Sequence, residues 1–223
     1  MYLTIDEASA QLQAAGRYLI EHQLAWGNAG NLSARTGPDR YVITASGTRL
    51  GELAADDLVE CVIDGDVVNA GGRKPSKERP MHEAIYAARP EINAVLHASP
   101  FHSTLIACSG ESVPSNLFVE SMYYLECVVR VPYRHPGSTA LGDVVGDHAT
   151  RANILLLDNH GVLVYDTNVQ EALMGLYTLE MTCRMWLAAR SAGVELRGLD
   201  PNVVGDFLDH AGYKPRRRWP SEG

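Results

Sequence analysis

The chain has 223 residues, of which 46% are hydrophobic and 21% charged, a composition typical of a folded globular protein. This length buries a large core without disulfide bonds, which excludes the class of small disulfide-stapled proteins. The net charge of −8 argues against a dedicated nucleic-acid binder.

The first third of the sequence predicts one helix and two hairpins. Thr4 and Glu7 match a capping box that opens an amphipathic helix, which we expect to end near Gln23. Four short apolar segments separated by turn residues pair as two hairpins: 32–35 with 41–44, and 58–63 with 67–68.

The rest of the chain alternates helices and strands. Helices are expected in four places: from Pro80 past Tyr86, over 103–108, from Ser138 to about 152, and from Asn168 to Ala192. Strands are expected over 92–97, 128–132, 153–157 and 161–165. This pattern predicts an α/β fold with a mixed or antiparallel sheet flanked by helices. We expect one domain over 1–223, with a C-terminal tail over about 199–223.

Two further features bear on partners and location. A basic cluster in the tail, Lys214 with Arg216, Arg217 and Arg218, is interpreted as a solvated tail rather than a binding patch. The four cysteines are scattered, and Cys61, Cys108 and Cys127 have apolar neighbours, which indicates reduced, buried thiols. With no leader-like or membrane-spanning run, we expect a cytoplasmic protein that binds neither membrane nor nucleic acid.

Small polar loops lie between the predicted elements and carry groups that bind anions. They are Asn28 to Asn31, Ser46-Gly47 and Ser76-Lys77-Glu78. Glycine-rich turns offer backbone N–H groups, serine and asparagine add donors, and Lys77 adds a positive charge. Taken singly, a loop of this composition is more often an ordinary turn.

The strand over 92–97 ends in His97-Ala-Ser99-Pro-Phe-His102. Side chains alternate along a strand, so His97 and Ser99 point the same way. Two histidines at that spacing would indicate a metal site, but the second position here is serine.

Five motifs follow one another in a fixed order: Gly30-Asn31-Leu-Ser33-Ala-Arg35, Thr44-Ala-Ser46-Gly47, Pro75-Ser76-Lys77-Glu78, His97-Ala-Ser99 and His160-Gly161. In this order, over roughly residues 5 to 190, the chain resembles the class II aldolase/adducin family. Its best-known members are the L-fuculose-phosphate and L-ribulose-phosphate enzymes.

The resemblance implies a three-layer αβα sandwich around a nine-stranded, mostly antiparallel sheet. It also implies a homotetramer with sites at the subunit interfaces, and a divalent metal, typically zinc, held by three histidines. A glutamate moves protons, and the small polar loops bind the phosphate of the substrate.

The family roles transfer residue by residue. His97 and His160 match two metal-ligand positions, and Glu78 matches the acid/base. The expected substrate- and phosphate-binding residues lie in the small polar loops: Asn28, Gly30, Asn31, Ser46, Gly47, Ser76 and Lys77. Lys77 stands where the family has a small serine-like residue, and its charge suits an anionic substrate.

The chain departs from the family pattern at two positions. Ser99 replaces a histidine ligand, and a neutral hydroxyl is a poor zinc ligand. Three alternatives stay open for the missing ligand: His102, Glu78 or water, with Mn, Fe or Co as metals besides zinc. Phe118 replaces a tyrosine that donates a proton across the interface. Tyr213 is our candidate substitute, with Tyr123 and Tyr124 as alternatives.

These residues predict a metal-dependent lyase that cleaves a carbon–carbon bond in a small phosphorylated, keto-sugar-like substrate through an enediolate. Two alternatives remain within the same fold: a decarboxylase of a sugar acid, and a dehydratase of a thiosugar phosphate. A third alternative is a non-catalytic, adducin-like binding protein, which the replacements at Ser99 and Phe118 motivate.

Overall fold

The computed structural model describes residues 2–69, 72–217 and 219. An eight-stranded sheet forms its central layer within these residues, one strand fewer than the resemblance implies. The strands are β1 (Asn31–Arg35), β2 (Arg40–Thr44), β3 (Leu58–Val62), β4 (Val67–Asn69), β5 (Ala94–Ala98), β6 (Val128–Val131), β7 (Ile154–Leu157) and β8 (Gly161–Asp166). Their order is β4-β3-β2-β1-β5-β8-β7-β6, and every neighbouring pair is antiparallel except β6 and β7.

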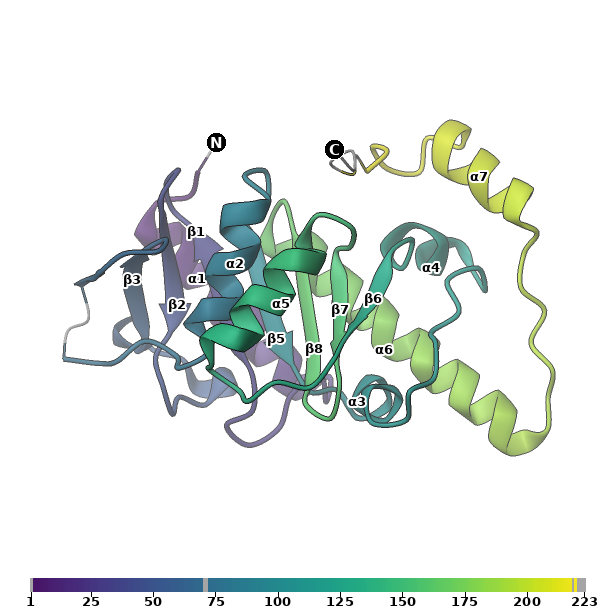
Figure 1. Cartoon of the computed structure of the whole chain (residues 1–223), viewed down its shortest axis with the longest axis horizontal. Coiled ribbons are helices and arrows are strands. Elements are labelled where there is room, and N and C mark those ends of the chain that lie inside the picture. The colour runs from purple at the N-terminus through teal and green to yellow at the C-terminus, as the bar shows by residue number, and fades with distance from the viewer. Residues whose placement is uncertain (1, 70–71, 218, 220–223) are drawn as a thin grey trace.

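Helices cover both faces of this sheet, as the sequence predicted (Figure 1). They are α1 (Ile5–Glu21), α2 (Arg79–Ala88), α3 (Phe101–Ala107), α4 (Val119–Tyr124), α5 (Thr139–Ala149), α6 (Val169–Ala192) and α7 (Pro201–His210). Two single-turn 3-10 helices lie at Leu50–Glu52 and Ala55–Asp57. In Figure 1, α2 and α5 lie in front of the sheet, whereas α1 and α6 lie behind it.

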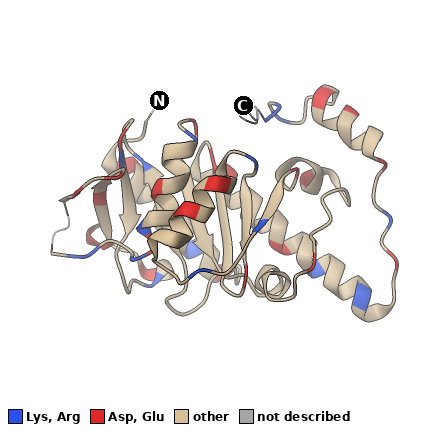
Figure 2. Cartoon of the chain, in the orientation of Figure 1, with Lys and Arg blue, Asp and Glu red and all other residues tan. Residues whose placement is uncertain are grey.

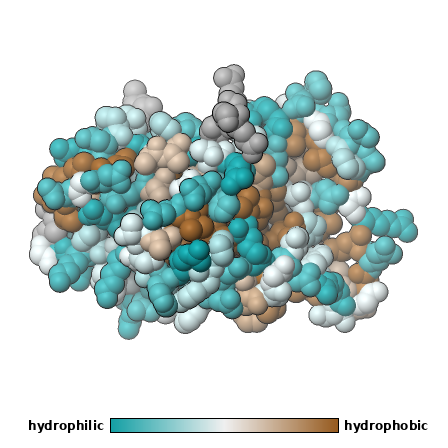
Figure 3. Space-filling view, viewed as in Figure 1, coloured by the Kyte–Doolittle hydropathy of each residue, from teal (hydrophilic) through white to brown (hydrophobic). Residues whose placement is uncertain are grey.

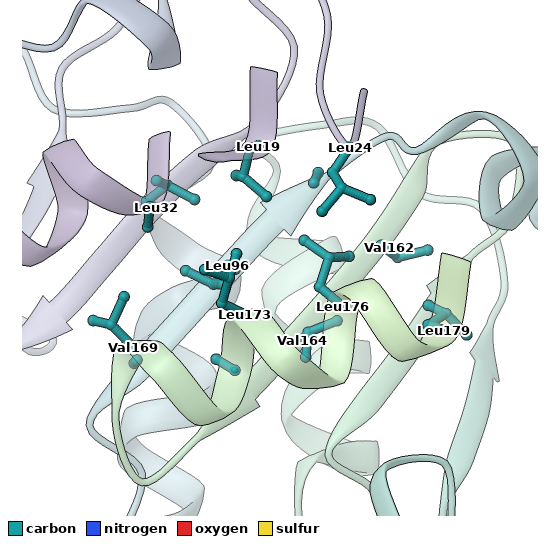
Figure 4. Close-up of a cluster of buried hydrophobic side chains, with 14 of the residues drawn as sticks. Leu19, Leu24, Leu32, Leu96, Val162, Val164, Val169, Leu173, Leu176 and Leu179 are labelled. Carbon is teal, nitrogen blue, oxygen red and sulfur yellow. The ribbon is translucent and has the colours of Figure 1, made fainter. Parts of the chain in front are cut away.

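Alternation along the strands divides the buried side chains between two cores. Leu32, Leu96 and Val164 point toward α1 and α6, where they meet Leu173 and Leu176 of α6 (Figure 4). Burial of each such side chain contributes about 1.5–3 kcal/mol to folding. The residues next to these on the same strands point the other way, toward α2 and α5. The polar side chains of β1 and β5 are among them and therefore lie on the α2 and α5 face.

The predicted hairpins and strands are confirmed, and so is the capping box: the Thr4 hydroxyl accepts a hydrogen bond from the Glu7 N–H, and the Glu7 carboxylate accepts one from the Thr4 N–H. The short helices α4 and α7 were not predicted. α4 is six residues long, too short for a sustained helical period, whereas α7 has start signals that the sequence analysis missed, with Asp200 as its N-cap and Pro201 in its first turn. Within the described residues, no helix is both long and apolar enough to cross a bilayer.

Two expectations about the tail and the cysteines are wrong. The described basic residues of the tail pair with carboxylates: Lys214 with Glu171, Arg216 with Glu126 and Asp209, and Arg217 with Asp166. Arg218 lies outside the described residues. Acidic and basic residues are interspersed elsewhere, with acidic bands on α2 and α5 (Figure 2).

Cys61 is buried as expected, Cys127 is half-buried, and Cys108 is exposed because it caps the end of α3.

Candidate active site

The centre of the candidate site lies where β1 and β5 pair. Asn31 and His97 are direct partners in the antiparallel register, and both point toward the α2 face. His97 is 2% exposed, and its Nδ1 lies 3.0 Å from the Val162 carbonyl oxygen. Because a carbonyl only accepts, Nδ1 carries the proton and the Nε2 lone pair of His97 faces the site.

Glu78 reaches the same point from the beginning of α2. The preceding segment is fixed to the end of β2: the Ser76 N–H donates to the Thr44 carbonyl at 3.0 Å, and the Ser46 N–H donates to the Lys74 carbonyl at 2.8 Å. The Glu78 N–H then donates to the Ser76 hydroxyl at 3.2 Å. These bonds place the Glu78 carboxylate against the two histidines.

His160 enters from the turn between β7 and β8. Its Nε2 lies 3.1 Å from Glu78 Oε1, and the His97 Nε2 lies 3.4 Å from Glu78 Oε2. A side chain at Gly161 would collide with the Ala98 carbonyl oxygen at 2.6 Å and the Ser99 hydroxyl at 2.8 Å. The glycine of the His-Gly motif therefore allows the turn to approach β5 closely enough for the two imidazoles to meet.

The electrostatics of this cluster favour an ionised Glu78 carboxylate and a neutral His97 imidazole. Burial raises the pKa of Glu78, but the neighbouring His97 and His160 and the Asn31 amide lower it more strongly, to about 2. Burial lowers the pKa of His97, against the opposing effect of Glu78. An ionised carboxylate and a neutral imidazole are the forms of these side chains that bind metal.

The donor set fits a divalent cation. One atom each from Glu78, His97 and His160 lie within 4.8 Å of one another. His160 Nδ1 is buried without a hydrogen-bond partner, and the nearest donor to the buried Glu78 Oε1 is His160 Nε2 at 3.1 Å. Two imidazole nitrogens and a carboxylate oxygen are ligands that zinc and other first-row metals accept.

A pocket of about 420 Å³ opens above this cluster. Every substrate-binding residue expected from the sequence lines it: Asn28, Gly30, Asn31, Ser46, Gly47, Ser76 and Lys77. Gly30 and Gly47 have positive φ angles, of 94° and 80°, a conformation that favours glycine. The loops therefore meet around one cavity, although they are far apart in sequence.

His102 and Tyr213 lie outside this pocket. His102 Nδ1 lies 2.7 Å from Glu180 on α6, so its ring is directed away from the Glu78, His97 and His160 cluster. Tyr213 packs against Tyr123 and Phe207, with ring centroids 5.8 Å and 5.5 Å away. The hydroxyls of Tyr123 and Tyr124 are bonded to the Pro215 carbonyl and to Glu171. None of these tyrosines reaches the pocket of its own chain.

Sequence reasoning missed several residues of the site. Trp26, Thr48 and Pro136 line the pocket, and His82 of α2 bonds to Asn31 with its Nε2 2.5 Å from the amide oxygen. Helical spacing was the available signal for His82, because it follows Glu78 by four residues and therefore shares its face of α2. No local signal in the sequence indicates that Trp26 lines the pocket, because its side chain is exposed beside a glycine-rich turn.

The three-layer sandwich therefore carries a pocket with a candidate His–His–carboxylate metal site at its floor, the donor set of a metal-dependent enzyme. Residues 10–187 match the family described as Class II Aldolase and Adducin N-terminal domain, and the chain belongs to this family.

Relatives and solved structures agree with this assignment. The chain is 31% identical over 196 residues to the 3-oxo-tetronate 4-phosphate decarboxylase of Haemophilus influenzae, covering 86% of this chain and 91% of the relative. It is 29% identical over 171 residues to the L-fuculose phosphate aldolase of Methanocaldococcus jannaschii, covering 77% and 91%. The crystal structure of YgbL from Klebsiella pneumoniae superposes with a TM-score of 0.81 at 28% identity, covering 92% of this chain and 99% of YgbL.

Proposed function

We propose that this protein is a metal-dependent lyase that cleaves a carbon–carbon bond in a small phosphorylated, keto-sugar-like substrate. The observation that carries the proposal is the position of Glu78. Its carboxylate lies between His97 and His160 on the floor of a pocket whose rim carries backbone amides, hydroxyls and Lys77. Aldol cleavage requires a base close to a metal and a group that binds the substrate phosphate, and Glu78, the two histidines and the pocket rim would supply these.

The proposed metal ligands are His97 and His160, with Glu78 as a further donor at rest. A bound divalent cation, for which zinc is our first choice, supplies a Lewis acid that stabilises the negative charge of an enediolate. His102, our sequence-based candidate for the third ligand, stays a prediction, and its bond to Glu180 weighs against it.

The chain's own residues perform the remaining steps. Glu78 accepts the proton of the substrate hydroxyl as the carbon–carbon bond breaks, and it returns a proton to the carbon of the enediolate. Asn31 holds one oxygen of this carboxylate by a 2.7 Å hydrogen bond. Ser46, Gly47, Ser76 and Lys77 hold the phosphate, because hydroxyls, backbone N–H groups and an ammonium are its natural partners.

Decarboxylation of a phosphorylated 3-oxo acid is the second candidate reaction. The name of the Haemophilus influenzae relative favours it. The chemistry is closely related, since loss of carbon dioxide also leaves an enolate that requires charge stabilisation and then a proton. The dehydratase and the non-catalytic adducin-like alternatives receive no comparable support from the relatives described above.

The deciding experiment is a substrate panel combined with metal analysis. Purified protein should contain close to one divalent metal per chain. It should cleave either ketose phosphates or 3-oxo-acid phosphates. Release of an aldehyde indicates aldol cleavage, and release of carbon dioxide indicates decarboxylation. Glu78→Gln should lower kcat by about 10²–10⁴-fold, the usual contribution of a general acid–base group. Full activity after removal of the metal by a chelator would contradict the proposal.

Assembly into a homotetramer is part of the proposal. Apolar residues come to the surface at the α4–α7 end of the molecule (Figure 3). Val119, Met185, Val194 and Val203 are each at least 40% exposed. A second copy that covers this end would bury them, and in the proposed assembly Tyr213 donates a proton in the pocket of a neighbouring copy.

A further inference from the structure

A row of buried polar side chains runs from the Glu78 carboxylate into the core between α2 and β1. Asn31, Ser33, His82 and Tyr86 are its other members, and none of these four is more than 5% exposed. Polar groups buried this deeply are costly unless each donor meets an acceptor. The row contributes one residue to the pocket rim, Asn31, and no step of the proposed reaction uses the other three.

The row exists because a helix and a strand advance by matching steps. Glu78, the N-cap residue of α2, is followed at intervals of four residues by His82 and Tyr86, and four residues along a helix rise about 6.0 Å. Asn31 and Ser33 are spaced by two residues on β1, a rise of about 6.6 Å. Helix and strand residues therefore alternate along the row without a gap.

Each contact in the row is within hydrogen-bonding distance. The Tyr86 hydroxyl lies 2.8 Å from the Ser33 hydroxyl, which lies 2.7 Å from His82 Nδ1. His82 Nε2 lies 2.5 Å from Asn31 Oδ1, and Asn31 Nδ2 lies 2.7 Å from Glu78 Oε2. At the inner end, Arg35 donates to the Tyr86 carbonyl oxygen and lies over its ring.

The direction of every bond follows from the carboxylate at the outer end. Ionised Glu78 only accepts, so the Asn31 N–H₂ faces it and Asn31 Oδ1 faces His82. His82 Nε2 therefore carries the ring proton, Nδ1 accepts from Ser33, and Ser33 accepts from Tyr86. Burial lowers the pKa of His82 to about 3, so the ring stays neutral and keeps this single tautomer near neutral pH.

We infer that His82 is a positioning residue of the active site: with its tautomer set by Ser33 and Tyr86, it orients the Asn31 amide so that Asn31 holds Glu78 Oε2. The other oxygen, Oε1, then faces His160, whose Nε2 lies 3.1 Å away, and is left for the reaction in the pocket. Without His82 the Asn31 amide can turn over, which would place two acceptor oxygens against each other and displace the carboxylate. This role rests on the proposed function of Glu78.

The first test reads the tautomer and requires no substrate. In protein labelled with ¹⁵N-histidine, the His82 ring signals, assigned by their loss in His82→Gln, should show a protonated Nε2 and an unprotonated Nδ1 near neutral pH. Ser33→Ala should shift the Nδ1 signal, because that nitrogen loses its donor. An Nδ1-protonated ring in the wild type would overturn the inference.

The second test separates positioning from packing. His82→Gln keeps one donor and one acceptor and should retain kcat within about threefold, whereas His82→Leu should lose about 10–100-fold, as removal of outer-shell partners does in metal sites. Equal kcat values for these two variants would overturn the inference.

A pair of tyrosines supplies a matched comparison if His82→Leu does not fold. Tyr41 is as buried as Tyr86, and the two rings lie 5.4 Å apart, but the Tyr41 hydroxyl donates to Glu83 and is outside the row. Tyr86→Phe should lower kcat and shift the His82 signals, and Tyr41→Phe should do neither. The same effect from both variants would overturn the inference. If wild-type protein turned over no substrate, the proposed function would fail while the tautomer measurement still tested His82.

Discussion

The Ser99 hydroxyl lies 3.4 Å from the carbonyl oxygen of His160 and donates a hydrogen bond to it. Ser99 occupies the position where the family resemblance expects a third histidine ligand. Its side-chain donor thus contacts the backbone of His160, one of the two histidines that we propose as metal ligands. The site therefore has a carboxylate and two histidines at its centre, with a small residue where the third imidazole would be.

Restoring the missing imidazole should strengthen metal binding. Ser99 lines the pocket beside His97 and His160, so Ser99→His should raise the affinity for zinc by about tenfold or more, since three histidines are a complete protein ligand set for zinc. Competition titration with a chromogenic chelator measures the change. As a control, Ser99→Ala removes only one long hydrogen bond and should change the affinity by less than about threefold. An unchanged affinity in Ser99→His would show that position 99 does not face the metal.

Metal content should separate the ligand histidines from His102. His97→Ala and His160→Ala should each remove most of the bound metal, because either change leaves a single imidazole beside Glu78. His102→Ala should retain it, since the His102 ring is bonded to Glu180 outside the cluster. Elemental analysis of the three purified variants measures this directly. Loss of metal from His102→Ala would instead restore our sequence-based interpretation of His102 as a ligand.

Lys77 should contribute to binding rather than to chemistry. Its exposed ammonium lies on the rim of the pocket, so Lys77→Met should raise KM for a phosphorylated substrate by about three- to tenfold and leave kcat nearly unchanged. Added salt should raise KM for the wild type more than for the variant, because ions screen an exposed charge. Lys74→Met is the matched control, since Lys74 is exposed on the same segment but outside the pocket lining. A fall in kcat with constant KM would assign Lys77 a different role.

The buried His82 should make the protein less stable in acid. Its pKa is about 3 in the folded protein, against 6.5 for an ordinary histidine. Between these values the unfolded chain binds a proton that the native chain does not, so the free energy of unfolding falls as the pH falls below 6.5. The contribution is about 1.4 kcal/mol per pH unit.

Denaturant unfolding of the wild type and His82→Gln over a pH series tests this. The difference in unfolding free energy between the two should be constant above about pH 7.5 and should shift in favour of the variant below it. The carboxylates common to both proteins cancel in this comparison. Parallel curves over the whole series would contradict a neutral His82 in the folded state.

Complementation should reveal whether Tyr213 acts across an interface. Tyr213 packs against its own Phe207 and Tyr123, so it can serve only the pocket of a neighbouring copy. Glu78→Gln and Tyr213→Phe should each be nearly inactive, and their subunits, once exchanged in equal amounts, should recover activity in about a quarter of the pockets of a symmetric oligomer.

A second mixture controls for subunit exchange itself. Glu78→Gln and His97→Ala damage the same pocket, so their mixture should recover nothing. Full activity in Tyr213→Phe alone would contradict a catalytic role for Tyr213.

The sequence by itself determined the family and much of the candidate site. Its motifs lie in loops at the ends of strands and at the beginning of α2, where the local chemistry of glycine, serine and asparagine can be recognised without knowledge of the fold. For this reason the residues from Asn28 to Lys77 that we expected around an anion do line one pocket. Strand alternation likewise placed His97 and Ser99 on one side of β5.

Only the tertiary structure decided which of the polar residues meet. His102 follows His97 by five residues, yet α3 turns its ring to Glu180, which lies 78 residues away in the sequence. The basic tail pairs with carboxylates of α6, of β8 and of the segment between α4 and β6, which local charge density does not indicate. The link from His82 through Asn31 to Glu78 depends on equal steps along a helix and a strand that are distant in sequence. Such contacts are set by the packing of helices against the sheet, and the local sequence does not indicate them.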